Sequence, residues 1–307
     1  MPIATLWHVM LCAVQNWWKD NCLRLAASLA YYTALSLAPL VLLIIGVVGL
    51  VLDRQQVAQQ LTTQLEGLMG PAGRELITSI LTTTSPQGGA LATIIGLITL
   101  FIGATAVFGE LQATMNLIWE VQPAPTSGVW AGIWAWLRQR VFSFAIVLAL
   151  AFLLLVSLVI SAALASAAAL FHGPEQALLS RLLEIAVSLL VLTFMFALLY
   201  KYVPDAEIGW RDVWLGGLLT AVLFTLGKTA IGIYLGRASV GSAYGAAGSM
   251  VVLLVWVYYS ALIMFFGAEF THAWATRHGG VTPQPHAVSG AAPQTKSEAA
   301  TDRPPRA

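Results

Sequence analysis

Residues 246–271 have the sequence AAGSMVVLLVWVYYSALIMFFGAEFT, in which Glu269 is the single charged residue. About 20 helical residues cross the ~30 Å apolar core of a bilayer. This stretch is therefore long enough to span a membrane as a helix. Other apolar stretches of sufficient length predict five more spans, so that the six together occupy residues 28–52, 91–109, 141–169, 183–203, 213–236 and 246–271.

The composition of the whole chain agrees with a polytopic membrane protein of the all-α class. Of its 307 residues, 58% are hydrophobic and 9% are charged, and the mean hydropathy is +0.80. A soluble domain has about 25% charged residues, so this chain has too little charge to cover the surface of a soluble globule. The net charge of +1 also provides no strongly basic surface, and a nucleic-acid partner is not expected.

The segments outside the spans complete the predicted domain organisation. Residues 1–27 carry Trp7, Trp17 and Trp18 at helical spacing and predict a cytoplasmic interfacial helix. No Lys or Arg precedes Lys19, so a signal peptide is not expected. Within the membrane domain, residues 28–278, the loop 53–90 has two apolar stripes separated by GPAG, which predicts a helical hairpin on the outer face. Residues 279–307 are rich in Pro, Ala, Ser and charge and predict a disordered cytoplasmic tail.

The distribution of cations predicts the orientation. Alternate flanks of the six spans, beginning with the N-terminal one, hold ten of the fifteen Lys and Arg residues, and the opposite flanks hold four. Because Lys and Arg are retained in cytoplasmic loops, both termini are predicted to be cytoplasmic. Cys12 and Cys22 then lie on the reducing side and are expected to be free thiols.

A charged residue inside a span needs a partner, a wet cavity or a route to the interface. Lys228 lies within the fifth span, and Glu184 at the start of the fourth has a suitable depth to pair with it. Lys228 could attract an anionic headgroup or a coupling ion; alternatively, it extends to the outer interface or forms a structural ion pair.

Three charges near the inner ends of the spans form a second candidate group. Arg24 leads into the first span, Glu110 ends the second and Glu269 ends the sixth. A buried pair of Arg24 with either carboxylate would brace an inner gate, and the alternative is that all three are interface charges. The loop carboxylates Asp205 and Glu207, beside Asp212, are interpreted as a solvated face.

Small residues concentrate in the last two spans and the turn between them. Gly216, Gly217 and Gly227 precede a GxxxG pair, and the turn itself is rich in glycine. Such residues allow close helix packing, although a glycine-rich turn that enters the membrane is the alternative. The predicted packing residues are Gly232, Gly236, Gly241, Gly245 and Gly248.

No catalytic or metal-binding pattern supports an enzyme. The five His residues stand in no HExxH motif and beside no CxxC pair, and the chain has no phosphate-binding GxxxxGK[ST] loop. No catalytic residue, metal, cofactor or built-in ATPase is therefore expected.

Three long motifs give the chain a family resemblance. RLAASLAYYTALSLAPL at 24–40, FGELQATMNLIWEV at 108–121 and the region from Trp210 to Trp274, with LGK, YGAAGS and FGAEF, resemble the YihY/virulence factor BrkB family of bacterial inner-membrane proteins. The resemblance implies six spans and an envelope role. Such proteins have carried an old ribonuclease label, and the absence of nuclease chemistry from this sequence argues that the label is mistaken. Thr225 stands where many relatives have an acidic residue, which leaves Lys228 without an adjacent counter-charge.

Two functions remain open at this point. The first is a transporter or flippase-like protein of the inner membrane for an anionic or amphipathic substrate, with membrane lipids as partners. The second is a non-transporting scaffold that binds envelope proteins or other copies of itself. The candidate intramembrane functional or gating residues are Arg24, Tyr31, Tyr32, Pro39, Glu110, Glu184, Lys228, Tyr234, Tyr244 and Glu269.

Overall fold

The computed structural model describes residues 3–48, 54–83, 90–121, 130, 134, 174–237 and 247–277. All regular elements within these ranges are helical, and the ranges contain no β-strand. The helices are α1 (Ile3–Lys19), α2 (Cys22–Val48), α3 (Arg54–Met69), α4 (Pro71–Thr83), α5 (Ala90–Ile118), α7 (Pro174–Tyr202), α8 (Trp210–Arg237) and α10 (Gly248–Arg277).

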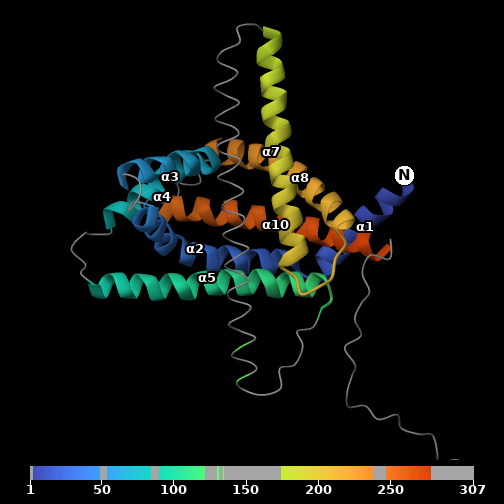
Figure 1. Cartoon of the computed structure of the whole chain (residues 1–307), viewed down its shortest axis with the longest axis horizontal. Coiled ribbons are helices and arrows are strands. Elements are labelled where there is room, and N and C mark those ends of the chain that lie inside the picture. The colour runs from blue at the N-terminus through green and yellow to red at the C-terminus, as the bar shows by residue number, and fades with distance from the viewer. Residues whose placement is uncertain are drawn as a thin grey trace, which may run out of the picture.

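Helix α10 is the centre of the arrangement. It packs against α2, α8 and α1, while α5 packs on α2 and α7 on α8. Figure 1 shows α10 and α5 side by side with α2, and α7 crossing them steeply. Helices α3 and α4 lie at the end where α10 begins, so α10 has a hairpin at its first turns and α1 along its last ones.

Three of the predicted spans have a counterpart in long apolar helices. The apolar stretches are Ile185–Tyr202, Trp210–Gly232 and Gly248–Arg277, each long enough to cross a membrane. The part of α2 from Cys22 to Ala38 is a shorter apolar helix, and α5 covers the second predicted span. The third predicted span, 141–169, and the tail, 279–307, lie outside the described residues, so the six-span topology stays a prediction.

The first span differs from its predicted boundaries. Helix α1 ends at Lys19, and α2 begins at Cys22, six positions before the predicted start of the span. Asn21 takes a positive φ of 53° between them, a conformation that asparagine tolerates better than most residues. Helix α2 then continues through Pro39 to Val48, so the proline does not end the helix.

The predicted helical hairpin corresponds to α3 and α4. Gly70 joins them with φ of 69°, and its amide donates to the Glu66 carbonyl at 2.8 Å. This left-handed glycine ends α3, and Pro71 starts α4, where its missing N–H has no cost. Arg74 also pairs with Glu66 at 2.7 Å across the turn. The position of this hairpin on the outer face remains a prediction.

Glycines bring the helices into close contact, but not at Gly232, the first residue of the predicted GxxxG pair. A Cβ on Gly217 would lie 2.6 Å from the Thr193 carbonyl oxygen of α7, and one on Gly227 would lie 2.6 Å from the Tyr259 hydroxyl of α10. In contrast, a Cβ on Gly232 would meet no atom within 4 Å. Gly232 therefore lies at an exposed part of α8, and no described helix packs on it.

Candidate functional site

A carboxyl group is fully buried near the C-terminal end of α10. Glu269 is 0% exposed, and its Oε2 has no hydrogen-bond partner. The buried Cys22 Sγ of α2 lies 4.0 Å from Oε1, which is a weak interaction. Glu269 lies eight residues before Arg277, or about 12 Å along the helix axis. This depth places it within the span and not in a loop.

The charged groups around Glu269 come from two other parts of the chain. Asp20 and Lys19 of the α1–α2 turn, with Glu120 after α5, act on it electrostatically. None of them forms an ion pair with it, because the only ion pair within the described residues joins Arg74 to Glu66. Carboxylates therefore outnumber cations around the buried group.

His272 extends this polar region by one helical turn. It follows Glu269 by three positions, so both side chains lie on the same side of α10. The His272 ring packs on the ring of the buried Trp119, with centroids 5.1 Å apart, and its Nδ1 is buried without a partner. We call Asp20, Cys22, Glu120, Glu269 and His272 the carboxyl cluster. Within the described ranges, no group of three or more His, Cys, Asp or Glu side chains could hold a metal ion.

Beside the carboxyl cluster, the loop between α7 and α8 is fixed to the end of α5. The Asp205 carboxylate accepts from Asn116 Nδ2 at 2.8 Å and from Gln112 Nε2 at 3.2 Å, and the Asp205 amide donates to Asn116 Oδ1 at 2.8 Å. Asp212 is 8% exposed. The interpretation of these loop carboxylates as a solvated face is therefore wrong for Asp212, which is buried. Asp205 is exposed, as that interpretation expects, and its carboxylate also joins the loop to α5.

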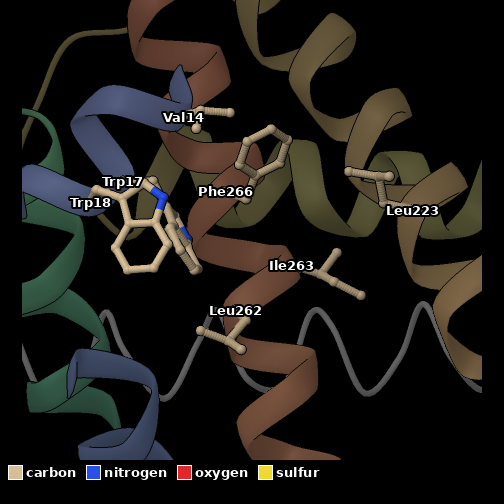
Figure 2. Close-up of a pocket in the computed structure, with 7 residues that line it drawn as sticks. All are labelled: Val14, Trp17, Trp18, Leu223, Leu262, Ile263 and Phe266. Atoms are coloured by element: carbon tan, nitrogen blue, oxygen red, sulfur yellow. The ribbon is translucent and has the colours of Figure 1, made fainter. Parts of the chain in front are cut away.

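An apolar pocket of about 280 Å³ lies between α1, α8 and α10. Figure 2 shows Trp17 and Trp18 of α1 on one side of α10 and Leu223 of α8 on the other. The two indole rings meet edge to face, with centroids 5.3 Å apart. The full lining is Val14, Trp17, Trp18, Leu223, Leu262, Ile263 and Phe266. Such a lining favours hydrocarbon and offers almost nothing to a polar ligand.

The predicted inner ion pair is absent from the described part of the chain. Arg24 is exposed and pairs with neither carboxylate, and Glu110 is half-buried. The reason is geometric. Cys22 faces α10, and a residue two positions later on a helix points about 200° away, so Arg24 turns from the carboxyl cluster. Of the two alternatives for these charges, the buried pair of Arg24 with Glu110 or Glu269 is therefore wrong.

Lys228 is exposed on α8, beside the buried Gly227. Because it has no ion pair within the described residues, we expect Lys228→Ala to change the free energy of unfolding by less than about 0.5 kcal/mol. Thermal unfolding of the purified protein in detergent, followed by tryptophan fluorescence, measures this change. A loss above about 1 kcal/mol would show a structural partner for Lys228. The Glu184 side chain lies outside the described residues, so its pairing with Lys228 stays a prediction.

The remaining predicted residues are separated from the carboxyl cluster or lie outside the description. Tyr31 is 58% exposed, and its ring meets that of the half-buried Tyr32 at 5.8 Å. Gly248 is buried in the first turn of α10. The side chain of Pro39 and the surroundings of Tyr234, Gly236, Gly241, Tyr244 and Gly245 lie outside the described residues.

Sequence reasoning identified Glu269 but missed the residues around it. Cys22 was interpreted as an ordinary thiol, and nothing in its sequence position predicts contact with a residue 247 positions later. His272 was detectable in principle, because it lies within one helical turn of Glu269. For the residues that line the pocket, the sequence pattern predicts only burial in a span or a place in the interfacial helix, and it does not predict a pocket.

Comparison with known sequences then identifies the family. A sequence profile described as virulence factor BrkB matches residues 13–291. The chain belongs to the BrkB family. The match includes every described residue of the carboxyl cluster, the pocket lining and α10, so the site lies entirely within the BrkB region of the chain.

Curated relatives of this BrkB family chain are named as membrane proteins. It is similar to a UPF0761 membrane protein of Alkalilimnicola ehrlichii, with 30% identity over 84% of this chain and 56% of the relative. A UPF0761 membrane protein of Alcanivorax borkumensis is 27% identical over 90% of this chain and 62% of the relative. The chain thus spans little more than half the length of these relatives. No solved structure matches it.

Proposed function

We propose that this BrkB family membrane protein moves an anionic or amphipathic solute across the bacterial inner membrane, without an ATPase of its own and without enzymatic chemistry. The observation that carries the proposal is the apolar pocket, because its walls come from two candidate spans and from a helix rich in tryptophan. A membrane lipid is the solute class that best fits it, with an acyl chain in the pocket. The cytoplasmic position of both termini belongs to the same proposal.

The setting of the pocket supports lipid as its occupant. Helix α1 packs on α10 through the buried Val9 and Ala13, while Trp7 is 65% exposed and Trp18, which lines the pocket, is still 60% exposed. Tryptophan is enriched where a bilayer meets water. If one face of α1 packs on the protein and the other lies at the bilayer–water interface, the pocket lies at the depth where the lipid acyl chains begin.

Filling the pocket tests the proposal. We expect Leu223→Trp to slow transbilayer movement of fluorescent phospholipid by about tenfold, the factor that ~1.4 kcal/mol of lost binding produces. The full chain is reconstituted in vesicles of phosphatidylethanolamine and phosphatidylglycerol. The measurement is the rate at which the inner-leaflet label becomes accessible to an external quencher.

The matched control is Leu226→Trp on the same helix. Leu226 is 65% exposed and does not line the pocket, so the same added bulk should leave the rate unchanged. Equal rates for both variants and the parent protein would contradict the pocket as the solute site. If the parent protein moves no lipid and cross-linking instead captures a stable envelope partner, the scaffold function replaces the transport function.

A further inference from the structure

An ionised carboxylate at the position of Glu269 has no compensation. The side chain is 0% exposed, Oε2 has no hydrogen-bond partner, and the groups nearest to it are the Cys22 thiol, 4.0 Å from Oε1, and the Asp20 carboxyl group. A buried charge without a counter-charge or hydrogen bonds is so costly that the group takes up a proton instead. Three observations therefore agree on the neutral form: complete burial, an unpartnered oxygen, and no ion pair at this residue.

The groups that face Glu269 from each neighbouring segment favour the same form. The α1–α2 turn contributes Asp20 and Lys19, the segment after α5 contributes Glu120, and α2 contributes the Cys22 thiol. Lys19 is exposed and forms no ion pair with Glu269. The two carboxylates oppose a further negative charge at Glu269, and one solvated ammonium does not offset them.

Titratable groups also lie between Glu269 and the exposed ends of the neighbouring segments. Asp20 is half-buried and acts directly on Glu269, and His272 lies three residues further along α10 with a buried, unpartnered Nδ1. Both are able to accept and release protons. Glu120, which is exposed, acts on His272 electrostatically.

We propose that Glu269 is a proton-binding site that holds a proton at neutral pH and exchanges it with the adjacent aqueous surface past Asp20 and His272. The O–H bond of the carboxyl group forms when a proton arrives by this route and breaks when the proton returns to water. The claim that this proton is the coupling ion of transport rests on the proposed function. The claim that Glu269 binds a proton does not depend on that function.

Infrared spectroscopy of the purified full chain tests the bound proton without any transport measurement. We expect a carbonyl band of a neutral carboxyl group at pH 7 in the parent protein, and loss of that band in Glu269→Gln. In heavy water the band should shift, because the proton exchanges. The band should also disappear reversibly at high pH. The matched control is Glu110→Gln, a half-buried carboxyl on α5, which should leave the band unchanged.

Every outcome of this experiment bears on the proposal. An unchanged spectrum in Glu269→Gln would overturn it, and a band that never shifts in heavy water would overturn the exchange route. Gln mimics a neutral carboxyl group in size and polarity, so failure of Glu269→Gln to fold would also count against a protonated Glu269. If the band is present but the reconstituted vesicles move no lipid, the proton site stands and the transport function is rejected.

Discussion

Gly267→Val should prevent accumulation of folded protein, with an expected loss of at least ~3 kcal/mol of stability. A Cβ on Gly267 would overlap the Thr220 hydroxyl and come within 2.5 Å of the Tyr200 hydroxyl. Those hydroxyls lie 2.8 Å apart, and Tyr200 also donates to the Met264 carbonyl at 2.8 Å. The added side chain would therefore separate α7, α8 and α10 where they meet. Size-exclusion chromatography of the detergent-extracted protein measures the folded fraction.

The matched control is Gly232→Val on α8. A Cβ there meets nothing within 4 Å, and Val is a better helix former than Gly. This variant should therefore accumulate as well as the parent protein. Equal accumulation of both variants would show that the three-helix contact at Gly267 tolerates bulk and that its closeness does not matter for folding.

Asn116→Asp should lower the free energy of unfolding by about 2 kcal/mol, because it replaces a charge-assisted hydrogen bond by repulsion between two carboxylates. The Asn116 amide now donates to Asp205 at 2.8 Å and accepts from the Asp205 backbone amide at 2.8 Å. The change keeps the size of the side chain and the backbone contact. The expected result is a lower thermal midpoint in detergent, measured by tryptophan fluorescence.

Exchanging the two side chains gives the sharpest control. In the double variant Asn116→Asp with Asp205→Asn, an amide and a carboxylate face each other again, so most of the lost stability should return. Glu207→Gln, on the same loop and exposed, should have no effect. A double variant as unstable as Asn116→Asp alone would contradict the role of this pair in fixing the loop to α5.

The fold features that could be predicted from sequence are those that depend on local pattern. Long apolar runs predicted the helices that contain Ile185–Tyr202, Trp210–Gly232 and Gly248–Arg277, because hydrocarbon selects them by length and composition. The GPAG turn predicted the break between α3 and α4 through the positive φ of Gly70. In both cases, neighbours in sequence determine the structure.

The site was less predictable, because it depends on contacts between distant segments. Glu269 stood out as a charge in an apolar run, but Arg24, one of the partners considered for it, faces elsewhere. Asp205 is held by a residue 89 positions earlier, and a carboxylate in a polar loop gives no local sign of such a partner. Hydropathy also does not distinguish Gly267 from Gly232. Side chains of α7 and α8 lie directly beside Gly267, whereas no atom lies near a Cβ on Gly232.

The central position of α10 has a consequence for biosynthesis. Helices α1, α2 and α8 all pack on it, yet the ribosome completes them before α10. They are synthesised while their common partner is still untranslated, and the carboxyl group of Glu269 meets Cys22 only when α10 joins them. Completion of the fold is therefore a late, post-insertional step, during which the surfaces that will contact α10 are open to lipid or to an insertion chaperone.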